Sequence, residues 1–192
     1  MKAIILAGGR GKRLKPVTDY VPKPLVPIKN IPIIEWQIKY LKKFGIKEVI
    51  ICTGYKADMI ESYLNVKKLG IKIKFSIEKS PLGTGGAIKK AGKMIKEKSF
   101  FVINGDTITN IDLRKLASKK NSIAAIELRT KYGVLEVESD KIINFKEKKE
   151  IPDTWMNAGI YHLEKEIIKK LPVKGDIDRK STRLNSSHSS VS

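Results

Sequence analysis

The amino-acid sequence predicts an α/β protein with a mostly parallel sheet, helices on both faces of that sheet and an added antiparallel meander. Two observations support this fold class. Through residues 1–119, short runs of Ile, Val, Leu and Phe alternate with segments of helical periodicity, which is the rhythm of βαβ units. After Asn121 the rhythm changes to closely spaced short strands. The chain of 192 residues is long enough for one domain with its own core and too short for two.

The first half of the chain supplies the parallel part of the sheet. Three of its four expected strands are continuous apolar runs, as in strands that are buried on both faces. The segment 71–77 alternates between apolar and polar residues, which predicts a strand at or near an edge. The expected strands are 3–7, 48–54, 71–77 and 100–105, and the expected helices are 33–44, 58–64, 84–96 and 113–119.

The second half adds the antiparallel strands. These are expected at residues 122–130, 132–139, 141–147 and 157–163, followed by a short helix at 165–171. Together the two halves describe a Rossmann-like architecture. Ligands of open α/β sheets bind beyond the carboxyl ends of the strands, so the segments that follow the strands are the place to look for chemistry.

The chain is strongly basic, with 39 Lys and Arg against 20 Asp and Glu and a formal charge of +19. Such a charge is typical of nucleic-acid binders, membrane-surface proteins and enzymes for polyanionic small substrates. The lysines are spread over the solvent faces of the predicted helices without clustered Arg or interleaved aromatics, which indicates a solvated surface rather than a specific nucleic-acid site. No apolar run reaches the roughly 18 residues of a membrane span. We therefore expect a cytoplasmic protein that does not bind membranes.

Two further residue types carry little chemistry. The single cysteine, Cys52, lies in an apolar run and is expected to be a small buried strand residue rather than a reactive thiol. His162 is expected to be a partly exposed strand residue rather than a base.

The composition changes abruptly over residues 178–192. Seven of these 15 residues are Ser or Thr, and neither helical nor strand periodicity is present. The string from Asp178 to His188 is also similar to one reading frame of an adapter oligonucleotide used in short-read sequencing libraries. We therefore expect a domain over residues 1–177 that is incomplete at its carboxyl end, followed by a disordered tail of artificial origin over 178–192. His188 is given no catalytic role.

A glycine-rich, basic turn follows the first strand. It contains Gly8, Gly9, Gly11, Lys12 and Arg13. Glycines let backbone NH groups approach phosphates, and the cations balance the phosphate charge. The spacing excludes both the Walker motif and the dinucleotide fingerprint. Ten residues further on, two prolines flank Lys23 and fix the backbone around it, which suits this lysine to hold a phosphate at the same strand end.

The segment from Leu6 to Ile28, LAGGRGKRLKPVTDYVPKPLVPI, resembles the signature of the sugar-1-phosphate nucleotidyltransferases. These enzymes join a nucleoside triphosphate to a sugar 1-phosphate and release pyrophosphate. The resemblance continues through PLGTGGAI, INGDT and NAGIY and covers residues 1–171. Lys12 stands where a Thr is commonest in the family, a change that keeps the turn positively charged.

The resemblance implies roles for the residues of this turn and for Asp106. It places the backbone of Leu6, Ala7, Gly8 and Gly9 against the base and ribose and adds Gly11 and Lys12 to the substrate-binding residues. Arg13, Lys23 and Asp106 become the catalytic residues, with both cations on the triphosphate and Asp106 as a ligand of Mg²⁺. From the residues alone, Asp106 reads more readily as a turn-capping Asp. The resemblance places the family's second metal carboxylate beyond Ile177, in a part that we expect this chain to lack. Loss of that carboxylate would impair turnover more than nucleotide binding.

The segment where the family reads the base contains Glu78, Gly83 and Thr84. A carboxylate only accepts hydrogen bonds, and guanine presents an NH and an NH₂ donor side by side, whereas uracil and thymine present a single NH. This difference favours GTP. A surface ion pair of Glu78 with Lys74 or Lys79 is the alternative interpretation.

The sugar-binding residues implied by the resemblance are Gly133, Glu147, Lys148 and Asn157, with Lys148 on the sugar phosphate. The pair Glu147–Lys148 lies in the charge run KEKKE, which also fits a solvated surface. We therefore predict guanylyl transfer from GTP to mannose 1-phosphate or a heptose 1-phosphate with Mg²⁺. A glucose-1-phosphate thymidylyl- or uridylyltransferase and a non-catalytic nucleotide-binding regulatory subunit remain open. The expected partners are the two substrates and, in a full-length parent, a second copy of the chain.

Overall fold

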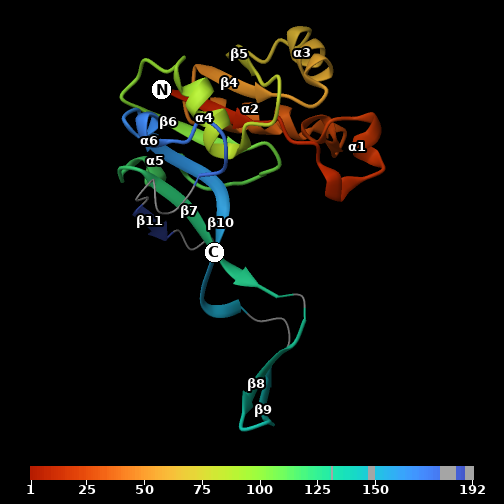
Figure 1. Cartoon of the computed structure of the whole chain (residues 1–192), viewed down its shortest axis with the longest axis vertical. Coiled ribbons are helices and arrows are strands. Elements are labelled where there is room, and N and C mark those ends of the chain that lie inside the picture. Colours follow the sequence, from red (N-terminus) through yellow and green to blue (C-terminus); the bar gives the residue numbers. More distant parts are fainter. Residues whose placement is uncertain (131, 147–149, 178–184, 189–192) are drawn as a thin grey trace.

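The computed structural model describes residues 1–130, 132–146, 150–177 and 185–188 (Figure 1). Its strands are β1 (Lys2–Leu6), β2 (Pro27–Ile28), β3 (Ile31–Pro32), β4 (Glu48–Thr53), β5 (Lys72–Ile77), β6 (Ser99–Asn104), β7 (Ser122–Arg129), β8 (Val134–Glu138), β9 (Lys141–Lys146), β10 (Glu150–Glu164) and β11 (Asn185–His188). The helices are α1 (Val17–Tyr20), α2 (Ile33–Lys43), α3 (Ala57–Asn65), α4 (Gly83–Gly92), α5 (Leu113–Ala117) and α6 (Ile167–Lys170), with two 3₁₀ turns, η1 (Lys12–Leu14) and η2 (Lys23–Leu25).

A seven-stranded sheet with the order β11-β7-β10-β6-β1-β4-β5 forms the centre of the molecule. β6, β1, β4 and β5 are parallel to one another, whereas β10 is antiparallel to both β6 and β7. The chain leaves β1 towards β4 and β5 and then returns to the other side of β1 with β6. A sheet whose order reverses in this way has a crevice at the carboxyl ends of the strands on either side of the reversal, here β1 and β6. The prediction of a mostly parallel α/β fold with added antiparallel strands is confirmed.

Alternate residues of the central strands point to opposite faces and build two separate cores. On one face, Ile5 of β1 and Ile51 of β4 pack with the apolar sides of α2, α3 and α5. On the other face, Ile4 of β1 and Ile50 of β4 pack with α4 and α6. All four of these isoleucines are fully buried, and burial of a side chain of this size stabilises the fold by roughly 1.5–3 kcal/mol. The predicted helices on both faces are therefore present, with β5 at the edge as expected.

Several element boundaries differ from the sequence-based expectations. Helix α4 ends at Gly92 instead of at residue 96. Glycine lowers helix stability at this point, and the backbone then turns through hydrogen bonds from the NH of Met94 to the carbonyl oxygen of Ala91 and from the NH of Ile95 to that of Gly92.

The burial of His162 also differs from the expectation. His162 lies on a strand as predicted, but its expected partial exposure is wrong, because only 5% of it is accessible. Its Nδ1 lies 3.0 Å from the carbonyl oxygen of Lys119, and its ring packs against Phe101. Cys52 is buried as expected.

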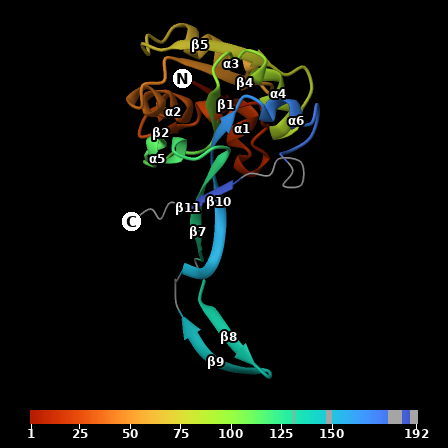
Figure 2. The same ribbon diagram turned by 90° about the vertical axis from the view of Figure 1, so that its left-hand side faces the viewer.

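The antiparallel strands do not follow one another across the sheet in chain order. β8 and β9 form a separate hairpin that stands away from the body in both views (Figure 1, Figure 2). β10 then returns along β7 and inserts between β7 and β6.

The carboxyl-terminal segment contributes one more strand, although its sequence shows no strand periodicity. Residues Asn185–His188 form β11, which pairs with β7 in parallel. The rest of that segment, 178–184 and 189–192, lies outside the described residues, so the disordered tail remains a prediction.

Candidate active site

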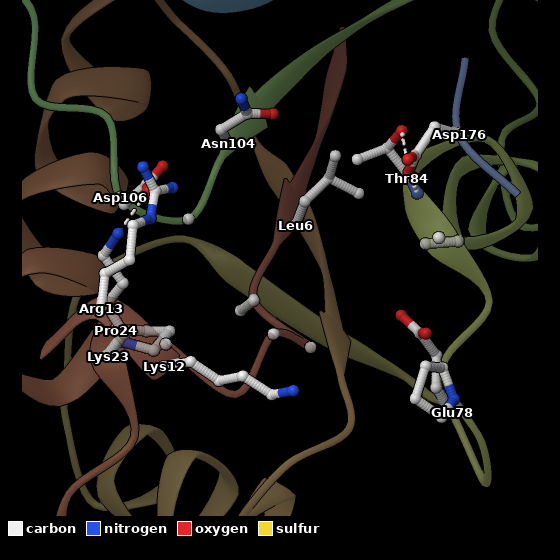
Figure 3. A pocket seen from close by; sticks show the side chains of 18 residues that line it. Leu6, Lys12, Arg13, Lys23, Pro24, Glu78, Thr84, Asn104, Asp106 and Asp176 are labelled. Carbon is white, nitrogen blue, oxygen red and sulfur yellow. Dashed lines mark hydrogen bonds and ion pairs between the residues drawn. The ribbon is translucent and has the colours of Figure 1, made fainter. Parts of the chain in front are cut away.

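A cavity of about 440 Å³ opens at the carboxyl ends of β1 and β6 and reaches the amino end of α4 (Figure 3). This is the crevice that the strand order predicts. The cavity is lined by Leu6, Ala7, Gly8, Gly9, Gly11, Lys12, Arg13, Lys23, Pro24, Glu78, Pro81, Gly83, Thr84, Ala87, Asn104, Gly105, Asp106 and Asp176. The structure thus brings together all the predicted catalytic residues and all the predicted nucleotide-binding residues.

The glycines of the turn after β1 serve different structural purposes. Gly11 has a φ of 63°, in the left-handed region that favours glycine, and a Cβ there would lie 2.9 Å from Cγ2 of Thr18. Thr18 is buried and its hydroxyl donates to the carbonyl oxygen of Gly11 at 3.1 Å, which fixes the end of the turn. A Cβ on Gly9 would meet nothing within 4 Å. Gly11 therefore shapes the turn, whereas Gly9 leaves open space beside the cavity.

The basic side of the cavity is formed by Lys12, Arg13 and Lys23. In Figure 3, Arg13 and Lys23 lie beside Asp106, whereas the Lys12 side chain extends away from it. Lys23 lies in η2 between two prolines, as the sequence suggested. Its Nζ lies 2.5 Å from Oδ2 of Asp106, and the two side chains are 25% and 41% exposed. An ion pair that is this accessible to solvent contributes little to stability, so both charges remain available to a ligand. Three cations and one carboxylate suit a polyphosphate that arrives with a metal ion.

Glu78 lies across the cavity from these cations, just after β5 (Figure 3). Its Oε2 accepts a hydrogen bond from the backbone NH of Leu82 at 3.0 Å, and a Cβ on Gly8 would lie 2.9 Å from its Oε1. Burial raises the pKa of the Glu78 carboxyl, and this effect outweighs the hydrogen bond from Leu82 and the charge of Lys90. The surface alternative does not fit, because Glu78 lines the cavity and, among the described residues, forms an ion pair with neither Lys79 nor Lys74, which pairs with Glu48 at 3.1 Å.

Asp176 is a cavity residue that the sequence analysis missed. Its Oδ1 accepts hydrogen bonds from the backbone NH of Thr84 at 3.0 Å and from the Thr84 hydroxyl at 3.2 Å. The carbonyl oxygen of Gly175 accepts from the NH groups of Gly85 and Gly86. Segment 175–176 therefore caps the amino end of α4 from a position 92 residues away along the chain. No local spacing pattern links the two segments, so the sequence offered no signal for this contact.

The predicted sugar-binding residues are only partly brought together. Asn157 lines a second cavity of about 540 Å³, which is also lined by Thr107, the residue after Asp106. The Asn157 side chain is held in place, because its Nδ2 donates to the Tyr161 hydroxyl at 2.7 Å and its Oδ1 accepts from the NH of Gly159 at 2.7 Å. Gly133 lines neither cavity and packs against the Phe145 ring in the β8–β9 hairpin. Glu147 and Lys148 lie outside the described residues.

The chemistry of the donor set limits the kind of metal site. Within the described residues, no group of three or more His, Cys, Asp or Glu side chains could hold a metal ion. Asp106 is the carboxylate on the basic side of the cavity, and Mg²⁺ is typically bound through one or two carboxylates together with substrate phosphates and water. The residues therefore fit a cation that binds with a polyphosphate, and they do not fit a closed all-protein cage.

None of the described helices is long and apolar enough to cross a bilayer.

Comparison with known proteins gives consistent matches. The family model described as "Nucleotidyl transferase" matches residues 2–187. D-glycero-alpha-D-manno-heptose 1-phosphate guanylyltransferase from Campylobacter jejuni is 47% identical over 172 residues, which cover 87% of this chain and 77% of the relative. Mannose-1-phosphate guanylyltransferase catalytic subunit beta from Xenopus tropicalis is 37% identical and is matched over 52% of its length and 91% of this chain. The crystal structure of HddC from Yersinia pseudotuberculosis complexed with GMP-PN superimposes with a TM-score of 0.77 at 34% identity, covering 99% of this chain and 90% of that one.

Proposed function

Because this chain belongs to the nucleotidyl transferase family, we propose that it transfers the guanylyl group of GTP to a sugar 1-phosphate and releases pyrophosphate. The observation that carries the proposal is a single cavity that combines a glycine turn, three cations, Asp106 and the half-buried carboxylate of Glu78. We propose a heptose 1-phosphate as the acceptor, with mannose 1-phosphate as the second candidate. The order follows the identity to the heptose 1-phosphate relative, 47%, against 37% for the mannose 1-phosphate relative.

In this reaction a phosphate oxygen of the sugar 1-phosphate attacks the α-phosphorus of GTP, and the bond from that phosphorus to the bridging oxygen of pyrophosphate breaks. No covalent enzyme intermediate is needed, so the rate depends on positioning and on neutralising the charge of the phosphates. Arg13 and Lys23 hold the α-phosphate and the leaving pyrophosphate, with Lys12 adding positive charge at the turn. Asp106 would hold Mg²⁺, which when bound would neutralise charge on the phosphates. On nucleotide binding, the Lys23–Asp106 ion pair opens and each partner turns to its ligand.

The guanine base is assigned to the side of the cavity that carries Glu78, Gly83 and Thr84. An ionised Glu78 accepts hydrogen bonds from the NH and NH₂ groups of guanine. The backbone of Leu6, Ala7, Gly8, Gly9 and Gly11 follows the ribose and phosphates. Asn157 and the cavity beyond Thr107 receive the sugar, which places its phosphate next to Asp106. The roles of Gly133, Glu147 and Lys148 remain predictions, as does the cytoplasmic location.

Thermal stabilisation of the chain by GTP, UTP, dTTP, CTP and ATP, each with Mg²⁺, tests the nucleotide part of the proposal. A site that exists only in the folded protein stabilises it by about 2.7 kcal/mol at 100 times the dissociation constant. We expect the largest shift with GTP. Lys23→Ala should abolish the shift, whereas Lys43→Ala, which removes an exposed charge at the end of α2, should preserve it. A larger shift with UTP or dTTP would support the thymidylyl- or uridylyltransferase alternative instead.

Pyrophosphate release tests the transfer itself. GTP with D-glycero-α-D-manno-heptose 1-phosphate should give the fastest release, followed by GTP with mannose 1-phosphate. GTP binding without pyrophosphate release with either sugar, or with glucose 1-phosphate, would favour a regulatory subunit that binds nucleotide without turnover.

A further inference from the structure

Gln37 occupies an unusual position in α2. The helix packs on the sheet through Ile34, Ile38 and Leu41, and the spacing of these residues places Gln37 on the same buried face. Only 2% of Gln37 is exposed. An apolar residue is the usual occupant of such a position, because a buried amide must find hydrogen-bond partners. The side chain therefore has a reason to be polar that helix packing does not supply.

The amide nitrogen of Gln37 ties together both ends of the turn that carries Asp106. Its Nε2 donates one hydrogen bond to the carbonyl oxygen of Asn104 and one to the carbonyl oxygen of Thr107, each at 2.8 Å. Both acceptors are carbonyl oxygens, so the NH₂ group and not Oε1 must face them. Oε1 is buried and has no hydrogen-bond partner among the described residues. The residue thus uses both donors on this turn and leaves its acceptor unsatisfied.

The rest of the turn has few supports near the Asp106 side chain. Gly105 is held from the other side, because its NH donates to the carbonyl oxygen of Leu6 at 2.9 Å. The NH of Thr107 donates to Asn104 at 3.0 Å and closes the turn. Asp106 belongs to no helix or strand, and its side chain pairs with Lys23, a residue assigned to the nucleotide. When Lys23 turns to a phosphate, the turn's position depends on these backbone anchors, on the Thr107 hydroxyl, which donates to the carbonyl oxygen of Ala158 at 3.4 Å, and on Gln37.

We propose that Gln37 is a positioning residue, which fixes the Asn104–Thr107 turn so that the Asp106 carboxylate meets the metal-bound triphosphate in the productive geometry. The inference rests on the proposed function, because it concerns the same cavity. Gln37 does not line that cavity and acts only through the turn. Misplacement of a reacting group by about 1 Å can cost 100-fold in rate, so a single anchor outside the cavity can have a large effect.

Hydrogen exchange of the turn's backbone tests the anchor without any turnover. Gln37→Met keeps the side-chain length and removes both donors. We expect the NH groups of Gly105 and Thr107 to exchange at least about 10-fold faster in this variant. Tyr40→Phe is the matched control, because it removes a hydrogen bond from the same helix to the carbonyl oxygen of Ile111, further along the same connection. Unchanged exchange in Gln37→Met would overturn the proposal. If Gln37→Met does not fold, Gln37→Glu, of equal length and with at most one donor, replaces it.

A double-mutant cycle with Asp106→Asn tests whether Gln37 acts through Asp106. Gln37→Met should lower kcat for GTP-dependent pyrophosphate release by about 10- to 100-fold with a smaller change in KM, and should cause no further loss when Asp106 is already Asn. A loss of equal size in both backgrounds would overturn the proposal. Binding of Mn²⁺ with GTP, followed by electron paramagnetic resonance, should weaken in Gln37→Met and not in Tyr40→Phe. If the native chain releases no pyrophosphate, the proposed function fails, while exchange and Mn²⁺ binding still decide the role of Gln37.

Discussion

Replacement of Glu78 by Gln is the sharpest test of base selection in this cavity. The substitution keeps the size of the side chain and an oxygen that can still accept from the NH of Leu82, which lies 3.0 Å from the carboxylate. It removes the negative charge and replaces one acceptor by an NH₂ donor, which would face a donor group of guanine. The local backbone should therefore be retained while recognition of guanine is lost.

The expected size of the effect follows from the kind of hydrogen bond removed. A hydrogen bond to a charged group contributes about 1.5–3 kcal/mol, and each 1.4 kcal/mol corresponds to a factor of ten. The value of kcat/KM for GTP should therefore fall by about 10- to 150-fold in Glu78→Gln. The value for UTP or dTTP should change much less, because each of these bases presents a single NH.

The assay compares pyrophosphate release with the three nucleotides at a fixed concentration of the same sugar 1-phosphate. Glu61→Gln, which makes the same charge change on α3, is the control and should leave all three values unchanged. An equal fall for GTP, UTP and dTTP would refute the assignment of Glu78 to the base and would indicate a general role in shaping the cavity. An unchanged kcat/KM with all three nucleotides would indicate that Glu78 takes no part in base recognition.

Glu78→Gln should lower activity with GTP but raise the stability of the ligand-free protein. Burial raises the pKa of Glu78, so the folded protein binds this proton more tightly than the unfolded chain does. The carboxyl contributes stability below its ordinary pKa, and that contribution is lost as the pH rises through the raised folded pKa. At neutral pH the ionised group is destabilising, and Glu78→Gln should raise the Tm of the ligand-free protein. The gain should shrink as the pH falls towards about 4, and a lower Tm at pH 7 would contradict this reasoning.

Three further predictions address the turn, the cap of α4 and the thiol. Gly11→Val should lower the Tm by forcing a branched side chain into a left-handed conformation that costs about 1–2 kcal/mol and should abolish stabilisation by GTP, whereas Gly9→Ala, with open space around its Cβ, should leave the Tm nearly unchanged. Asp176→Ala should cost about 1 kcal/mol in urea unfolding through loss of the hydrogen bonds to Thr84, and an unchanged midpoint would show that the cap contributes nothing. Cys52, whose pKa is raised by burial, should not react with a thiol reagent at pH 8 in the native protein and should react once the chain is unfolded.

The parts of the site that the sequence predicted are those that depend on local chemistry. The turn after β1 requires glycine at Gly11 for its backbone conformation, and Lys23 lies in a proline-flanked 3₁₀ turn, so both features are visible as short patterns. The continuous apolar runs likewise predicted the central strands β1, β4 and β6, which are buried on both faces. In each case the local sequence is enough to predict the structure, and contacts with distant segments agree with it.

The parts that the sequence did not predict depend on contacts between distant segments. Asp176 reaches Thr84 across 92 residues, and Gln37 reaches Thr107 across 70. His162 was expected to be partly exposed because it lies in an alternating segment, but its strand, β10, lies between β6 and β7, and its ring packs against Phe101 of β6. The sequence also did not show that Gly133 lies with a hairpin away from both cavities. Alternation of apolar and polar residues predicts the two strands but not the direction in which their hairpin extends.

These distant contacts explain how a turn without regular structure can serve a reaction that depends on positioning. Asp106 has no secondary structure of its own, yet its turn is bounded by Leu6 of β1 on one side and by Gln37 of α2 on the other. The base side of the cavity is fixed in the same manner, since Asp176 caps the helix that begins at Gly83. Lys23 and Glu78, in contrast, present their charged groups to the cavity itself. Substitutions of the anchors should therefore change rate and local exchange together, while substitutions of Lys23 and Glu78 should change nucleotide affinity and selectivity with little effect on the backbone.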